Sequence, residues 1–161
     1  MPYSGTGSGR DYDTYRIRSA YTPALTTNYS FSQRNDFGSD ADQLAWLKAR
    51  AEEYLRLRPY FSEDFYPLTE ISDKSDVWSA AQFNRPSEGD GIVQAFRRED
   101  SPYTECAFRL RGLDPEKNYV FIDIDDPDRS LEISGKELAV RGFKVRMEEQ
   151  RSAKIWLYHA K

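Results

Sequence analysis

The spacing of the hydrophobic positions changes once along the chain, from a helical period to a strand period. The helical part is residues 40–58, where apolar side chains recur three or four residues apart: Leu44, Leu47, Ala51, Tyr54 and Leu55. Such a set lies on one face of an amphipathic helix. Pro59 follows directly and stops further helix. We therefore predict one helix, with this set as its buried face.

Short apolar runs separated by turn residues follow from about Ser75 onward. The runs are residues 76–83, 92–98, 105–111, 118–124, 131–133, 143–147 and 153–158. In the third run, Cys106, Phe108 and Leu110 alternate with polar residues or alanine, which is typical of a half-buried strand. In the second run we expect Phe96 to point into the core. Short strands between regular turns indicate an antiparallel β-sandwich or a small barrel.

The first 39 residues are rich in Gly, Ser, Thr and Tyr. Within them, residues 14–22 predict one strand, which Pro23 interrupts or ends. A single strand and a single helix cannot bury their own apolar faces. Residues 1–58 therefore read as part of something larger.

Composition excludes several classes of function. The chain has 161 residues and a net charge of −4, which argues against a dedicated nucleic-acid surface. No apolar run approaches the roughly 20 residues that span a bilayer, and the N-terminus lacks the apolar region of a signal peptide. Cys106 and His159 are the only residues of their types, which excludes an intrachain disulfide and disfavours a metal centre. We expect no cofactor, no metal, no nucleic-acid or membrane partner, and a cytoplasmic location.

Two groups of acids are candidates for chemistry. Residues 123–128 carry acids at alternate positions, but a calcium loop requires Gly where the chain has Asp128. We therefore predict an acidic hairpin turn. Glu63 and Asp64 are adjacent, and in an extended segment their side chains point in opposite directions, so they would not act together on one bond. A structural role in a tight connection is favoured for them.

Three stretches carry a resemblance to a known family. They are LRLRPYFSEDFYPLT at residues 55–69, DVWSAAQFNRP at residues 76–86 and GDGIVQAFRR at residues 89–98. Together they resemble the C-terminal end of bacterial α-galactosidases (melibiases) of glycoside hydrolase family 36. The family often has Tyr-Gly where this chain has Ser62-Glu63, and Asp where it has Asn84.

The resemblance implies a mainly β fold, with a C-terminal antiparallel β-sandwich preceded by a strand and helix that end a (β/α)8 barrel. Residues 1–58 would be the terminal strand–helix part of the barrel, residues 59–75 a connection, and residues 76–161 the accessory sandwich. Residues 15–20 look like the eighth barrel strand.

The resemblance also bears on the site residues. In this family the catalytic carboxylates belong to the fourth and sixth barrel strands, which have no counterpart here, so we assign no catalytic residue. Tyr3 and Arg18 are candidates for lining the sugar site, because loops at the C-terminal ends of barrel strands face the substrate. They equally fit a scaffold role.

Two functions follow. The first is a C-terminal portion of an α-galactosidase-like hydrolase, non-catalytic by itself, supporting a barrel that binds the galactoside. The second is a free-standing carbohydrate-binding or interaction module, with Trp78 or Trp156 as a stacking platform. Because the helix at residues 40–58 exposes an apolar face, we also expect self-association, a partner chain that supplies the missing barrel, or a mobile segment over residues 1–39.

Overall fold

The computed structural model describes residues 13–25 and 41–161. The chain divides into two compact units, Met1–Pro59 and Tyr60–Lys161, which we call the helical unit and the sheet unit. Each is described by itself. Within the described ranges, no helix has the length and apolar character needed to cross a membrane.

The first helix of the helical unit, α1 (Thr14–Ser19), lies where the sequence predicted a strand. That prediction, including the assignment of residues 15–20 to a barrel strand, is wrong. The Asp13 side chain caps the helix by accepting a hydrogen bond from the Arg16 backbone N–H at 3.0 Å. The strand preference of Thr, Tyr and Ile depends on context, so a good cap and tertiary contacts prevail.

The second helix, α2 (Ala41–Leu57), confirms the predicted helix at residues 40–58. Its buried face differs from the predicted one. Tyr54 is buried as expected, but Leu55 is 60% exposed, and Leu57, outside the predicted set, is fully buried. The side chain of Leu44 and the proposed cap at Ser39 lie outside the described residues. A short 3-10 helix, Arg58–Ser62, follows α2.

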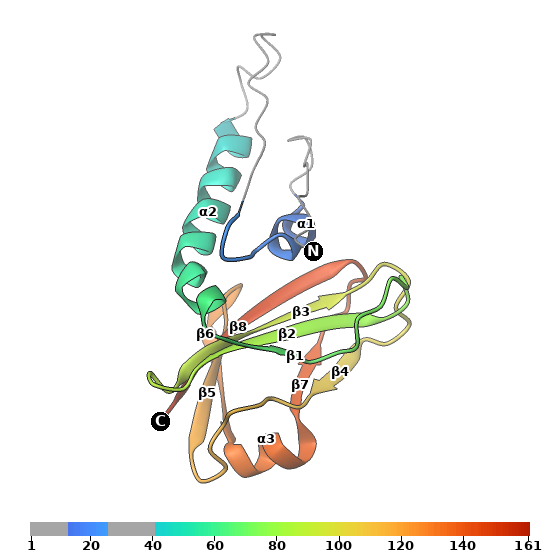
Figure 1. Cartoon of the computed structure of the whole chain (residues 1–161). Coiled ribbons are helices and arrows are strands. Elements are labelled where there is room, and N and C mark those ends of the chain that lie inside the picture. Colours follow the sequence, from blue (N-terminus) through green and yellow to red (C-terminus); the bar gives the residue numbers. More distant parts are fainter. Residues whose placement is uncertain (1–12, 26–40) are drawn as a thin grey trace. The chain divides into compact units, whose positions relative to one another are not determined.

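The sheet unit contains eight strands and one helix. They are β1 (Asp64–Pro67), β2 (Trp78–Arg85), β3 (Asp90–Arg97), β4 (Glu105–Phe108), β5 (Asn118–Asp123), β6 (Asp126–Ser134), α3 (Gly135–Arg141), β7 (Phe143–Arg146) and β8 (Ser152–Ala160). Six strands form one sheet in the order β1-β2-β3-β8-β5-β6, and β4 pairs with β7 in a second sheet. All these pairs are antiparallel. The β-sandwich prediction is confirmed (Figure 1).

Two elements of the sheet unit were not predicted. Strand β1 lies within residues 59–75, where the sequence predicts a connection, and pairs with β2. Ser134 caps the N-terminus of helix α3, where its hydroxyl accepts a hydrogen bond from the Glu137 backbone N–H at 3.2 Å, and Gly142, with a φ of +76°, caps the C-terminus. Its seven residues are too few to show a clear helical period. The predicted acidic hairpin is confirmed, because β5 ends at Asp123 and β6 begins at Asp126.

The core lies between the six-stranded sheet on one side and the β4–β7 sheet with α3 on the other. The Phe121 and Phe143 rings stack across it with centroids 4.3 Å apart. Trp78 and Trp156 are both buried members of this core. Phe96 is not, because alternation along β3 places Val93 and Ala95 in the core and leaves Phe96 half-buried on the opposite face. The prediction that Phe96 points into the core is wrong.

Candidate functional site: a hollow at the open end of the sandwich

A hollow of about 520 Å³ opens in the sheet unit where the β5–β6 hairpin faces strand β7. We call it the sandwich hollow. Strands from both sheets line it, with these residues: Glu105, Phe121, Asp123, Asp126, Arg129, Leu131, Lys144, Val145, Arg146, Met147, Glu148, Lys154 and Trp156. Its volume falls in the range of roughly 300–1,000 Å³ that is typical of ligand pockets.

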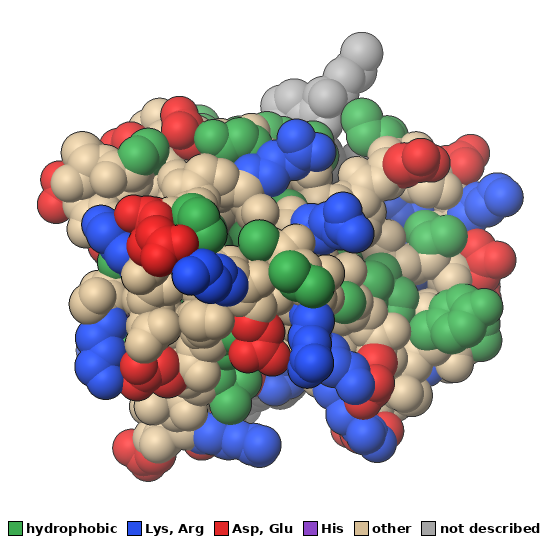
Figure 2. Space-filling view, turned by 90° about the horizontal axis from the view of Figure 1, so that it is seen from below, with side chains coloured by type: hydrophobic (Ala, Val, Ile, Leu, Met, Phe, Trp, Pro, Cys, Tyr) green, Lys and Arg blue, Asp and Glu red, His purple; other side chains and the backbone are tan. Residues whose placement is uncertain are grey.

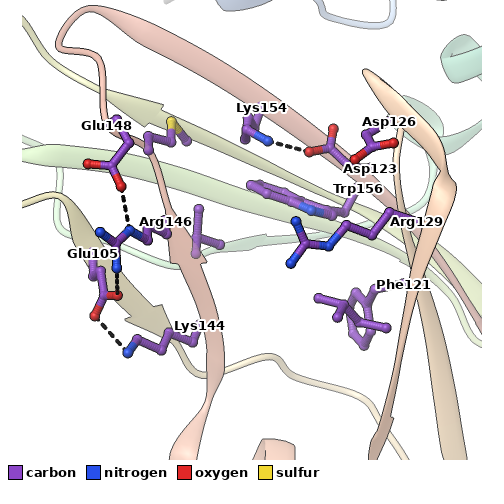
Figure 3. A pocket seen from close by; sticks show the side chains of 13 residues that line it. Glu105, Phe121, Asp123, Asp126, Arg129, Lys144, Arg146, Glu148, Lys154 and Trp156 are labelled. Atoms are coloured by element: carbon purple, nitrogen blue, oxygen red, sulfur yellow. Dashed lines mark hydrogen bonds and ion pairs between the residues drawn. The ribbon is translucent and has the colours of Figure 1, made fainter.

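The β7 side of the hollow is a chain of ion pairs (Figure 3). Lys144 contacts Glu105 at 2.6 Å, and Arg146 contacts Glu105 at 3.3 Å and Glu148 at 2.5 Å. The cross-strand register brings Glu105 of β4 opposite Arg146 of β7. Each charge here already has an opposite partner, so this wall has little net charge to offer a ligand.

The pKa of Glu105 is lowered, chiefly by the hydrogen bond from Lys144 and further by Arg146. Glu148 in turn raises the pKa of Arg146. A carboxyl group that acts as a general acid near neutral pH needs a raised pKa, so Glu105 is shifted in the wrong direction for that task.

On the opposite wall, Lys154 of β8 forms an ion pair with Asp123 at the end of β5. Asp123 is nearly buried, with 11% of its side chain exposed. The Lys154 ammonium also lies 5.7 Å from the centroid of the Trp156 ring, within reach of a cation–π contact. The charge of Asp123 is thereby balanced by that of Lys154, and the Lys154 ammonium lies over the indole ring.

Two charged groups in the hollow are unpaired. Asp126 and Arg129, both on β6, have no hydrogen-bond or ion-pair partner in the described part of the chain. Figure 3 shows the Arg129 guanidinium between the Trp156 ring and the Phe121 side chain. An unpaired carboxylate acts as an acceptor and an unpaired guanidinium as a multiple donor, so together they suit a ligand that carries both donors and acceptors.

The site residues predicted from the sequence lie elsewhere. Tyr3 lies outside the described residues. Arg18 is in the helical unit, 1% exposed, where its Nε and Nη2 donate to Glu53 at 2.9 and 2.8 Å. Tyr21 donates to the same carboxylate at 2.9 Å, and Arg50 contacts it at 3.0 Å. These contacts are those of a buried structural network; a contact between Arg18 and substrate stays a prediction.

The other groups considered from the sequence also stay apart from the hollow. Glu63 and Asp64 are exposed, and Asp64 accepts from the Tyr66 hydroxyl at 3.3 Å. Cys106 is partly buried against the core, where burial raises the pKa of its thiol. His159 is exposed on β8. Over residues 13–25 and 41–161, no group of three or more His, Cys, Asp or Glu residues is placed to hold a metal ion.

Sequence reasoning missed the sandwich hollow because its residues come from five strands. In the sequence, the site is marked only by the acidic residues at 123–128, which Arg129 follows directly. The register shift between Ile122 and Asp123 is visible only in the structure.

The surface around the sheet unit is of mixed charge. Lysine, arginine, aspartate and glutamate side chains are interspersed on the face that Figure 2 shows. No broad region of one sign is present on that face.

No family model and no curated protein sequence matches the chain. Solved structures do match it. The GH36 α-galactosidase AgaA from Geobacillus stearothermophilus superposes with a TM-score of 0.67 at 16% identity, over 91% of this chain and 19% of that one. A variant of AgaA in complex with raffinose matches with a TM-score of 0.65 at 16% identity. AgaB from the same organism matches with a TM-score of 0.61 at 18% identity. The AgaA variant and AgaB each match over 91% of this chain and 19% of their own length.

These similarities agree with the resemblance found in the sequence. The chain spans about a fifth of the length of the enzymes that it matches. At these identities the similarity concerns the fold. We conclude that the chain has a fold found within GH36 α-galactosidases, a small helical part joined to an antiparallel β-sandwich.

Proposed function

We propose that this chain is the C-terminal portion of an α-galactosidase-like glycoside hydrolase, and that it supports the catalytic barrel without performing hydrolysis. The observation that carries the proposal is the structural match, which includes nearly the whole chain but a small part of each enzyme. The motif resemblance at residues 55–98 points to the same family.

The charges in the sandwich hollow agree with a supporting role. A retaining glycosidase uses a nucleophile and a protonated acid about 5 Å apart. In the hollow, Glu105, Glu148 and Asp123 are each paired with a cation, and the pKa of Glu105 is lowered. Asp126 is unpaired, but one carboxylate does not make the pair that the mechanism requires.

An activity assay tests the proposal directly. We expect the purified chain to release no nitrophenol from 4-nitrophenyl α-galactoside above the buffer rate. Turnover that is abolished by Glu63→Gln or Asp64→Asn would overturn the proposal and identify the adjacent carboxylates as catalytic. The coding sequence offers a second test, since the region upstream or a neighbouring gene should encode barrel strands that carry two carboxylates.

The sandwich hollow favours a second candidate, a carbohydrate-binding module. Trp78 does not serve as its platform, because it is not among the residues that line the hollow and its Nε1 donates to the Tyr103 carbonyl at 3.0 Å. Trp156 does line the hollow. Calorimetric titration of the chain with galactosides separates the two candidates, since the supporting role alone requires no heat of binding.

A further inference from the structure

We propose that the sandwich hollow binds a neutral saccharide, held by Asp126 and Arg129 against the apolar edge formed by Trp156 and Leu131. The inference gives the second candidate function its ligand and its contact residues. It is independent of the supporting role, because a sandwich can bind sugar whether or not it also stabilises a barrel.

The equal numbers of positive and negative side chains in the hollow favour a neutral ligand. Its lining contains four cationic side chains (Arg129, Lys144, Arg146 and Lys154) and four anionic ones (Glu105, Asp123, Asp126 and Glu148). An anionic ligand would be attracted by Arg129 but repelled by Asp126. A cationic ligand would be attracted by Asp126 but repelled by Arg129. A neutral ligand with several hydroxyl groups satisfies both, because each hydroxyl donates and accepts.

The unpaired groups are the ones available for contact. Lys154 and Asp123 are engaged with each other, and Arg146 links Glu105 to Glu148. Asp126 and Arg129 have no such engagement within the described residues. Hydrogen bonds to charged groups are among the stronger ones, and binding a ligand here does not first require breaking an ion pair.

The apolar part of the hollow fits the carbon face of a sugar ring. Leu131 is 42% exposed, and it lines the hollow together with Trp156 and Phe121. Trp156 is only 6% exposed, so it offers an edge and not an open stacking face. Apolar walls with a few oriented polar groups are the usual composition of small-molecule sites.

Nuclear magnetic resonance titration of the full chain with methyl α-galactoside tests the proposal. The readout is the indole N–H signal of Trp156, identified by its loss in Trp156→Phe. We expect this signal to shift saturably, and Arg129→Met and Asp126→Asn each to weaken binding about tenfold or more. Arg141→Met on α3 and Asp128→Asn, which lie outside the lining of the hollow, are the matched controls and should bind like the parent.

Three results would overturn the proposal. The first is a Trp156 signal that does not respond to the sugar. The second is equal loss of binding in the control variants, which would show a general effect of surface charge. The third is tighter binding of inorganic phosphate or galacturonate that depends on Arg129 but not on Asp126, which would identify an anion site. None of these outcomes bears on the α-galactosidase assay, so failure here is distinguishable from failure of the supporting role.

Discussion

In the helical unit, one of the most deeply buried side chains is the guanidinium of Arg18, whereas the sheet unit buries the rings of Phe121, Phe143 and Tyr158. Around Arg18, Glu53 accepts hydrogen bonds from Arg18 and Tyr21 and lies beside Arg50. Burial and the Glu53 charge raise the pKa of Tyr21 far above its ordinary value, so its hydroxyl stays protonated and donating. In the sheet unit, contacts between rings join the large side chains of the core, and the buried Arg97 donates to backbone carbonyls.

The stability of a buried charged network and that of an aromatic core respond differently to the loss of one side chain. A charged network stabilises only when every group is paired, because one uncompensated buried charge costs several kcal/mol. An aromatic core depends on filled volume, and each truncation costs roughly in proportion to the cavity it leaves. In the described part of the helical unit, several groups therefore depend on Glu53, whereas the sheet unit distributes its stability over many buried side chains.

Removing a ring from the aromatic core should give the largest effect. We expect Phe143→Ala to lower the free energy of unfolding of the sheet unit by about 3–5 kcal/mol, because the ring stacks on Phe121 and packs edge-on against Trp156. Urea denaturation followed by tryptophan fluorescence measures it. Phe65→Ala is the control, since that ring is 57% exposed, and should cost less than about 1 kcal/mol. Equal losses in the two variants would contradict the assigned core.

Breaking the charged network should have a nearly equal but local effect. We expect Glu53→Ala to destabilise the helical unit by about 3 kcal/mol, because it leaves the buried Arg18 without its carboxylate. Hydrogen exchange at the Ala20 and Tyr21 amides, which bond to Ile17 and Arg18 carbonyls, reports it. Glu52→Ala should leave exchange unchanged, because Glu52 is exposed and 4.0 Å from Lys48. If Glu53→Ala and Glu52→Ala accelerated exchange equally, the helical unit would not depend on the buried network around Glu53.

Gly91 of β3 has no room for a side chain. A Cβ added at Gly91 would lie 2.3 Å from the Tyr158 hydroxyl and 2.4 Å from the Phe83 carbonyl oxygen. Since Gly91 is the cross-strand partner of Tyr158, neither atom can move without disturbing the sheet. We expect Gly91→Ala to lower stability by about 2 kcal/mol, measured by thermal unfolding. A loss under about 0.5 kcal/mol would mean that Tyr158 is not held over the β3 backbone.

The exposed ion pairs of β7 should contribute little to the free energy of unfolding. The pKa of Glu105 is lowered from 4.5, so its pairing with Lys144 stabilises the fold above that pH, and the contribution is lost as the pH falls through the lowered pKa. We expect Glu105→Gln to be slightly less stable than the parent at neutral pH, with the difference disappearing in acid. Urea midpoints between pH 2 and 7 measure it, and a difference that grows in acid would contradict this sign.

Much of the sheet unit could be predicted from local pattern. The alternation of Cys106, Phe108 and Leu110 is found in β4 and the residues after it, with Phe108 buried and the others partly so. The hairpin at residues 123–126 follows from its acids. These features depend on a period of two and on turn chemistry, which a few neighbouring residues specify. The predicted core face of β3 was wrong at Phe96. Strand β3 is a central strand with buried residues on both faces, so buried and exposed positions do not alternate clearly along it.

The helical unit and the candidate site show what the sequence could not determine by itself. By its own pattern, the chain determined the helix at residues 40–58, the antiparallel sandwich and the resemblance at residues 55–98. The helix at residues 14–19 depends, besides its Asp13 cap, on a contact between Arg18 and Glu53, which are 35 positions apart and whose pairing has no local signature. Likewise, only the tertiary structure brought Asp126 and Arg129 beside Trp156, since a hollow lined from five strands depends on sheet order and on a register shift that no short stretch encodes.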